Sequence, residues 1–199
     1  MGREFELKYR SDDRINEALR VQYGPFTPIT METTYYDTPR RELSQRRWTL
    51  RRRYENGVCV CTVKTPGSNG ARGEWETECD DILCAVEALI ALGAPEELAA
   101  LTRNGVAEVC AARFIRLAAL LQREDCTVEL ALDSGFLMGG GHQLPFAEVE
   151  VELKSGSEAG AVRFAQELAK RYGLEPEPKS KQQRARALST IGEKEYGKS

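Results

Sequence analysis

Alternation of charged and apolar side chains along short segments is the feature that most constrains the fold of this chain. Residues 4–10 alternate in this way: Glu4, Phe5, Glu6, Leu7, Lys8, Tyr9 and Arg10. Successive side chains of a β-strand point to opposite faces, so the segment predicts a strand with one ionic and one apolar face. Taken alone, it could be a half-solvated strand of any sheet.

The same alternation recurs in four later segments. They are residues 49–53, 60–64, 72–78 and 146–154. Their charged faces carry closely spaced acidic and basic residues. Five separate solvent-exposed surfaces would not explain why both kinds of charge recur in this way. If the sheet closes with these faces inward, the charges line one lumen that can hold a divalent metal and a polyanion. We therefore predict an α+β fold, a closed antiparallel eight-stranded β-barrel with helices packed outside.

Helical periodicity and turn residues place the remaining elements. We predict a short helix between Ser11 and Gly24, two helices in residues 81–104, and helices at 157–172 and 179–188. Asp37 is predicted to start a turn, residues 40–47 to form a solvated basic connector, and residues 175–178 to form an extended spacer. The expected organisation is one domain, residues 1–199, with the tunnel and flanking helices in about 1–173 and a basic helix and tail in about 174–199.

Composition excludes several classes of function. Lys plus Arg total 28 against 31 Asp plus Glu, a net charge of −3, so no basic excess favours nucleic acid or an anionic membrane. The chain has no apolar run of about 20 residues and no signal-like start, which predicts a cytoplasmic protein. It has no CxxC pair or Cys/His cluster, and its one histidine, His142, follows a glycine run. Zinc and histidine-dependent nucleophile schemes therefore have weak support.

An ordered set of motifs resembles the CYTH superfamily, also called triphosphate tunnel metalloenzymes. The first is the ExExK motif at Glu4–Lys8, and the others follow in the family's order over nearly the whole chain: Thr34–Pro39, Leu50–Arg53, Thr62–Thr65, Arg72–Glu76, Leu132–Gly135, Glu148–Glu152 and Lys179–Lys181. The resemblance implies an eight-stranded tunnel that binds a small polyanion, with Mg²⁺ or Mn²⁺ as cofactor. From composition we expect no nucleic-acid or membrane partner, and a homodimer is left open.

Basic residues of the tunnel are the predicted phosphate ligands. They are Lys8, Arg51, Arg53, Lys64, Arg72, Arg116, Lys181 and Arg184. Arg116 is expected to point inward and Arg113, three residues earlier on the same strand, outward. The resemblance places Lys181 and Arg184 near a tunnel end, although a basic helix here could equally be a solvated tail.

Carboxylates of the tunnel are the predicted metal ligands, because Mg²⁺ and Mn²⁺ prefer oxygen donors. They are Glu4, Glu6, Glu74, Glu76, Asp133, Glu148, Glu150 and Glu152. The first of two metals is assigned to Glu4, Glu6 and two of the last three glutamates, and the second to Asp133 with Glu76 or Glu74. Lys8, Glu6 and Glu76 are the predicted catalytic residues, and Lys8 would hold a phosphate oxygen or the attacking water.

The motifs are most similar to those of bacterial inorganic triphosphatases, which implies hydrolysis of tripolyphosphate to pyrophosphate and phosphate. Thiamine triphosphatase and class IV adenylate cyclase are alternatives on the same fold. A polyphosphate- or nucleotide-binding module without turnover is an alternative of another class. A third alternative, a structural protein held by ion pairs, requires every lumen charge to be paired within the protein.

Overall fold

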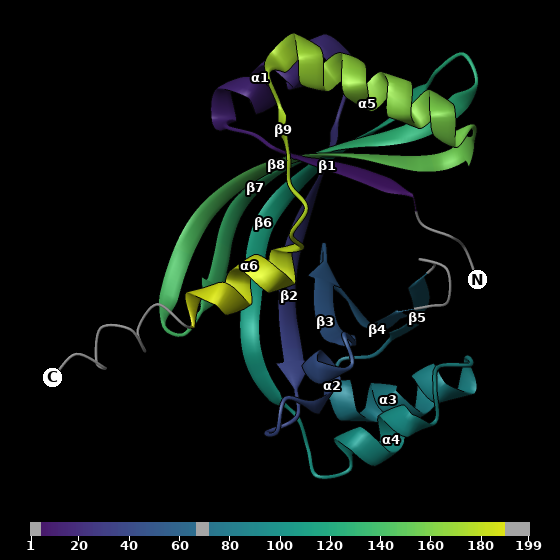
Figure 1. Ribbon diagram of the computed structural model, residues 1–199, viewed down its shortest axis with the longest axis vertical. Helices are drawn as coiled ribbons and strands as arrows, with labels where there is room; N and C mark the ends of the chain where they lie inside the picture. The colour runs from purple at the N-terminus through teal and green to yellow at the C-terminus, as the bar shows by residue number, and fades with distance from the viewer. Residues whose placement is uncertain (1–4, 67–71, 190–199) are drawn as a thin grey trace, which may run out of the picture.

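One antiparallel sheet dominates the structure, a computed structural model that describes residues 5–66 and 72–189 (Figure 1). Its strands lie in the order β5-β4-β3-β2-β6-β7-β8-β1-β9. Their bounds are β1 Glu6–Arg10, β2 Thr27–Asp37, β3 Thr49–Glu55, β4 Val58–Pro66, β5 Arg72–Glu78, β6 Ala107–Gln122, β7 Cys126–Gly139, β8 His142–Gly156 and β9 Glu175–Pro176.

Six helices accompany the sheet. They are α1 Asp13–Tyr23, α2 Glu42–Gln45, α3 Ile82–Ala91, α4 Glu97–Thr102, α5 Glu158–Tyr172 and α6 Lys181–Leu188. Side-chain caps begin several of them, as at α1, where Asp12 Oδ1 accepts from Ile15 N at 2.7 Å, and at α5, where Ser157 Oγ accepts from Gly160 N. Gly173 ends α5 in the left-handed conformation. None of the described helices is long and apolar enough to cross a membrane.

The predicted closed eight-stranded barrel is not confirmed, because the described sheet is open and has nine strands. Its two edges are β5 and β9. β9 pairs with β1 through Tyr9 and Arg10, on the edge of β1 that does not pair with β8. β9 takes part of this edge, and β1 and β5 are not paired in the described sheet. The segment predicted as a mere spacer thus supplies an edge strand, a position in which Pro176 is tolerated.

The outer face of the curved sheet carries two apolar cores covered by helices. α1 and α5 cover one of them, where Leu168 packs with Leu130 and Val151 from β7 and β8. α3 covers the other, where Leu89 packs with Leu50 and neighbouring β4 residues. Full burial of each such side chain stabilises the fold by about 1.5–3 kcal/mol. The prediction of helices outside the sheet is correct for these elements.

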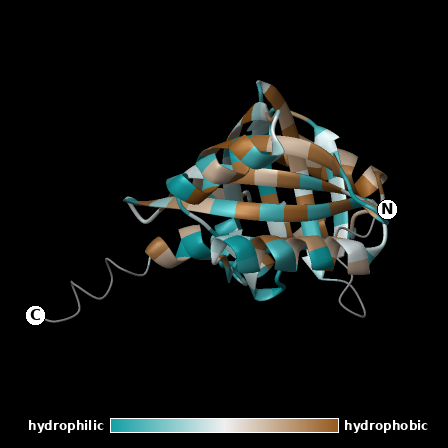
Figure 2. Cartoon of the chain, turned by 90° about the horizontal axis from the view of Figure 1, so that it is seen from above, coloured by the Kyte–Doolittle hydropathy of each residue, from teal (hydrophilic) through white to brown (hydrophobic). Residues whose placement is uncertain are grey.

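The inner face carries the charged positions, and α6 lies across it (Figure 1). Ala185 and Leu188 of α6 pack with Phe114 and Leu137 of β6 and β7. α6, whose segment was left open between a position near a tunnel end and a solvated tail, thus lies on the inner face. Alternation of polar and apolar residues along the strands is visible in Figure 2. Arg116 is 15% exposed beneath α6, whereas Arg113 is 64% exposed, as the alternation predicts.

The connector between β2 and β3 is a turn organised by Asp37, and its arginines are exposed as predicted. Asp37, 1% exposed, accepts hydrogen bonds from the backbone N–H groups of Thr38, Leu43 and Ser44. These bonds hold the short helix α2, which the sequence did not predict. The predicted turn-forming role of Asp37 is confirmed.

Candidate functional site

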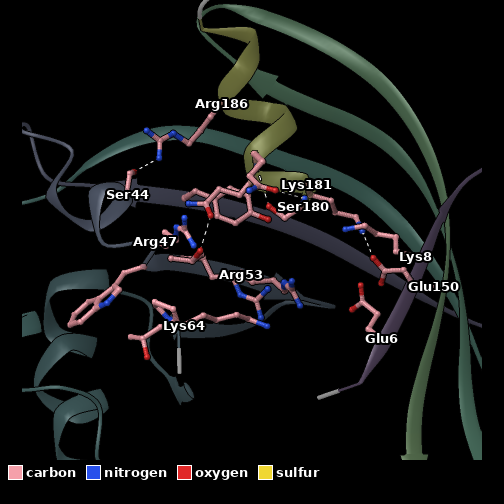
Figure 3. Close-up of a pocket in the computed structure, with 18 of the residues that line it drawn as sticks. Glu6, Lys8, Ser44, Arg47, Arg53, Lys64, Glu150, Ser180, Lys181 and Arg186 are labelled. Carbon is pink, nitrogen blue, oxygen red and sulfur yellow. Dashed lines mark hydrogen bonds and ion pairs between the residues drawn. The ribbon is translucent and has the colours of Figure 1, made fainter. Parts of the chain in front are cut away.

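A cavity of about 950 Å³ lies on the inner face of the sheet, between the strands and α6 (Figure 3). Strands β1 to β4, β6 and β8 contribute to its wall, and so do the α2–β3 connector and α6. Its volume far exceeds that of a single metal ion, so it can admit a small-molecule ligand.

The lining carries many more cations than anions. Among the described residues, eight basic side chains line the cavity: Lys8, Arg47, Arg51, Arg53, Lys64, Arg116, Lys181 and Arg186. Three carboxylates line it: Glu6, Glu150 and Glu152. An excess of positive charge in a concave site favours a polyanion, and arginine binds phosphate oxygens in a bidentate manner.

Basic residues on β3 and β4 are paired with acids on β5. Arg51 Nη2 lies 3.3 Å from Glu76 Oε1 and 3.6 Å from Glu74 Oε1, and Lys64 Nζ lies 2.8 Å from Glu74 Oε2. Thr62 Oγ1 donates to Glu76 Oε1 at 2.9 Å. Burial would raise the pKa of Glu76, but the hydrogen bond from Thr62 and the charge of Arg51 outweigh it and lower that pKa. Glu76 is therefore ionised at neutral pH.

Three carboxylates meet on the neighbouring strands β7 and β8, beside the cavity. Asp133, Glu148 and Glu150 each place one oxygen within 4.8 Å of the others, and all three residues are buried. Lys181 lies at their centre: its Nζ is 2.8 Å from Asp133 Oδ2, 2.5 Å from Glu148 Oε2 and 2.7 Å from Glu150 Oε1. We call Asp133, Glu148 and Glu150 the carboxylate triad.

Two arginines complete the charge balance of the triad. Arg116 donates from Nε and Nη2 to the two oxygens of Asp133, both at 2.8 Å, and from Nη2 to Glu150. Arg184 donates to Glu148. Burial would lower the pKa of Arg116, but the charges of Asp133 and Glu150 outweigh it and raise that pKa. The arginine stays charged.

The pKa values of Lys181 and of two triad members shift in different directions. Burial would lower the pKa of Lys181, but the surrounding carboxylates outweigh it and raise that pKa. Burial would raise the pKa of Glu150, but the charges of Lys181 and Arg116 outweigh it and lower the pKa. Burial raises the pKa of Glu148, and its basic neighbours offset only part of this rise.

The position of Lys181 shows that the basic segment 179–188 is not a solvated tail.

The predicted site residues fall into three groups. Those brought to the cavity wall are Glu6, Lys8, Arg51, Arg53, Lys64, Arg116, Glu150, Glu152 and Lys181. Asp133, Glu148, Glu74, Glu76 and Arg184 do not line it, but each pairs with a charged partner beside it. Glu4 and the side chain of Arg72 lie outside the described parts of the chain. The structure groups Asp133 with β8, whereas the second predicted metal shell joined it to Glu74 or Glu76 on β5.

Sequence reasoning missed two basic residues of the lining. Arg47 was assigned to a solvated connector, but its backbone turns at φ 59° and the residue lines the cavity (Figure 3). Arg186 donates to Ser44 Oγ, which links α6 to α2. Their presence in arginine-rich runs was the only sequence signal. Three aromatic residues also line the cavity: Tyr35, Trp48 and Phe114.

The lining fits the divalent metal that the motifs imply. Glu6 and Glu152 are cross-strand partners on β1 and β8, and Glu150 lies opposite Lys8 in the same register. Their carboxylate oxygens are hard donors, which Mg²⁺ and Mn²⁺ prefer over sulfur or imidazole. All three residues line the cavity, although the side chain of Glu150 is only 8% exposed.

Comparisons with known proteins agree with this geometry. An inorganic triphosphatase of Haemophilus influenzae is 26% identical over 175 residues, which cover 84% of this chain and 50% of that protein. The chain thus spans about half the length of this curated relative. Among solved structures, a putative adenylyl cyclase from Hippeastrum, described as having a dominant triphosphatase activity, is 20% identical with a TM-score of 0.66, and covers 92% of this chain and 95% of its own.

A second solved structure, a Pyrococcus horikoshii protein, is 25% identical with a TM-score of 0.58, and covers 96% of this chain and 99% of its own. The family model described as the CYTH domain matches residues 2–185. The match confirms the resemblance drawn from the ordered motifs. Because it extends over most of the sequence, from before β1 into α6, the chain belongs to the CYTH domain family.

Proposed function

We propose that this chain is a metal-dependent triphosphatase that hydrolyses inorganic tripolyphosphate to pyrophosphate and phosphate in the cavity. The observation that carries the proposal is the excess of basic side chains over carboxylates in the lining. A ligand with several negative charges would complete the site electrostatically. The similarity to an inorganic triphosphatase supports the same substrate class.

The basic residues would hold the phosphate chain and stabilise the charge that develops on it. Arg51, Arg53 and Lys64 line the cavity from β3 and β4, and Lys8 and Arg116 line it from β1 and β6. A triphosphate among these residues would be contacted from several strands, which restricts it to one orientation for in-line attack by water. Fixed donors at developing negative charge are the main source of catalysis in such transfers.

The carboxylates facing the cavity would hold the metal. When bound, Mg²⁺ or Mn²⁺ supplies charge neutralisation of phosphate oxygens and a water of lowered pKa. Glu6, Glu150 and Glu152 are the residues of the lining that fit this task. Lys8, opposite Glu150 in the β1–β8 register, is placed to contact a phosphate oxygen or the attacking water.

A nucleoside triphosphate is the second candidate substrate, and Trp48 is the observation that favours it. Trp48 lines the cavity and is only partly buried, whereas Tyr35 and Phe114 are 5% and 6% exposed. A base could stack on one face of this indole. No second accessible aromatic residue among the described lining residues would enclose the base, so we expect inorganic tripolyphosphate to be preferred.

A phosphate-release assay tests the proposal. Tripolyphosphate, ATP and thiamine triphosphate are each incubated with the protein, with Mg²⁺, with Mn²⁺ and without metal, and products are separated by ion-exchange chromatography. We expect tripolyphosphate to be cleaved fastest, to pyrophosphate and phosphate. Equal or faster turnover of ATP, or formation of cyclic AMP, would contradict the substrate assignment. Binding of all three compounds without turnover would identify a binding module.

Arg47 and its neighbour Arg46 form a matched pair for testing whether Arg47 contacts the substrate. Arg47 lines the cavity and its side chain makes no hydrogen bond or ion pair with the described residues, whereas Arg46 Nε pairs with Glu97 of α4 at 2.9 Å. We expect Arg47→Ala to lower kcat/KM for tripolyphosphate by about 10-fold or more, the loss of one charged contact. Arg46→Ala should stay within about twofold, because an exposed pair contributes at most about 1 kcal/mol to stability. Equal effects in steady-state kinetics would contradict this placement of Arg47.

A further inference from the structure

The carboxylate triad already holds a cation, the ammonium group of Lys181. Lys181 Nζ contacts one oxygen of each triad member at 2.5–2.8 Å. The side chains of Asp133 and Glu148 are 0% exposed, and those of Glu150 and Lys181 are 8% and 10% exposed. The ammonium therefore occupies the point at which the three carboxylates converge, and solvent hardly reaches it.

The same point has the composition of a divalent metal site. Three carboxylate oxygens from two adjacent strands lie within 4.8 Å of one another, which suits an ion that binds oxygens at about 2.0–2.1 Å. Oε2 of the fully buried Glu148 lies 2.5 Å from Lys181 Nζ and pairs with no other described residue. A carboxylate oxygen has two lone pairs, so this oxygen could also bind a divalent ion in place of the ammonium.

Two cations cannot share this position. An ammonium and a divalent ion within a few ångströms would repel strongly in a buried setting, and the triad has room for one of them. We propose that Lys181 and a divalent cation compete for the carboxylate triad, so that the ion binds there only when the ammonium leaves. This rests on the proposed function only in taking Mg²⁺ or Mn²⁺ as the ion.

Release of the ammonium does not require α6 to detach. Lys181 is the first residue of α6, and Ser180 and Gln183 form a capping box that holds this end of the helix. Gln182 accepts from Thr49 of β3 at 2.7 Å, and Ala185 and Leu188 pack in the inner core. The flexible side chain of Lys181 can turn toward the cavity, which it already lines, while the helix stays in place.

The exchange changes the charge of the site. With Lys181 in place, the three carboxylates are balanced by Lys181, Arg116 and Arg184, so the cluster is formally neutral. A divalent ion in place of the ammonium adds one positive charge to the cluster and returns a second to the cavity. The ion would thus make the site more attractive to a polyanion, with Lys181 as the group that responds to it.

The test is binding of Mn²⁺ alone, measured by electron paramagnetic resonance without substrate. We compare wild type with Lys181→Met and with the matched control Lys179→Met, an exposed lysine two residues earlier. We expect Lys181→Met to bind Mn²⁺ at least about 10-fold more tightly than wild type, and Lys179→Met to match wild type. Equal or weaker binding by Lys181→Met would overturn the proposal.

Two further variants test where the ion binds and replace Lys181→Met if it does not fold. Adding Glu148→Gln to Lys181→Met should abolish the gain in affinity, and a gain that persists would place the ion elsewhere and overturn the proposal. If circular dichroism shows Lys181→Met to be unfolded, Lys181→Gln, which keeps a hydrogen-bond donor without charge, replaces it under the same expectations. Since no substrate is present, the outcome is independent of whether tripolyphosphate is hydrolysed.

Discussion

Replacing Arg116 with alanine is expected to lower turnover of tripolyphosphate by about 100-fold or more, the range found when an electrostatic stabiliser of the transition state is lost. Arg116 lines the cavity and is held by Asp133 and Glu150, so its guanidinium group is fixed before substrate arrives. A group already in position needs no reorganisation when charge develops on the phosphate. The measurement is steady-state kinetics of phosphate release.

Arg113 is the matched control on the same strand. It is 64% exposed and lies 3.7 Å from the exposed Glu32, so Arg113→Ala should stay within a fewfold of wild type. Arg116→Ala also removes one of the two basic partners of the buried Asp133 and Glu150, which we expect to lower the free energy of unfolding by about 3–5 kcal/mol. Activity is therefore compared at a temperature where circular dichroism shows all variants folded. Loss of activity in Arg113→Ala but not in Arg116→Ala would mean that the two faces of β6 are assigned the wrong way round.

Neutralising Glu6 is expected to abolish metal-dependent hydrolysis without unfolding the protein. Glu6→Gln keeps the size of the side chain but removes the charge that a divalent ion requires. Glu6 is exposed to the cavity, so we expect the free energy of unfolding to change by no more than about 0.5 kcal/mol. Treatment of wild type with EDTA should have the same effect on activity, and Mg²⁺ or Mn²⁺ should restore it.

Glu17 provides the control for this substitution. It lies on α1, on the outer side of the sheet, and pairs with Arg20 one helical turn away at 2.7 Å. Glu17→Gln should keep full activity and full metal dependence. Wild-type turnover that survives EDTA, or a Glu6→Gln variant as active as wild type, would refute the assignment of Glu6 as a metal ligand.

Alternation along the strands predicted which charged residues share a face. Glu6 and Lys8 reach the cavity from β1, Arg51 and Arg53 reach it from β3, and Arg116 reaches it from β6. These positions follow from the two-residue period of a strand, which is a local property of the backbone. Once the sheet forms with its apolar outer face against helices, the opposite face is determined.

Positions that depend on contacts between distant segments could not be predicted in this way. Arg47 turns into the cavity because Asp37 organises the connector before it. No periodic pattern in the sequence predicts this turn. Glu177 was part of a predicted spacer, yet it is 4% exposed and pairs with Arg10 at 2.8 Å and with Arg184 at 3.8 Å. Burial of Glu177 results from packing of the segment after α5 beside β1.

The open edge of the sheet also depends on contacts between segments that are distant in the sequence. The alternating pattern indicates that charged faces point inward, but it does not encode which strand occupies the free edge of β1. Tyr9 and Arg10 pair with the two residues of β9, a strand too short to leave a pattern. Lys181 likewise has no pattern that predicts its place among buried carboxylates, since Arg184 and Arg186 of the same helix are also basic.

The location of the carboxylate triad on one hairpin has a consequence for folding. β7 and β8 are joined by a tight turn and pair over their whole length, so their contacts form with little loop-closure entropy. Within this hairpin Asp133 lies directly opposite Glu148, and like charges in that position are destabilising. Arg116 of β6 offsets part of this charge, and Lys181, 31 residues beyond Glu150, adds its own charge only when α6 docks. We therefore expect hairpin formation and helix docking to be cooperative, since part of the repulsion within the hairpin remains until the helix docks.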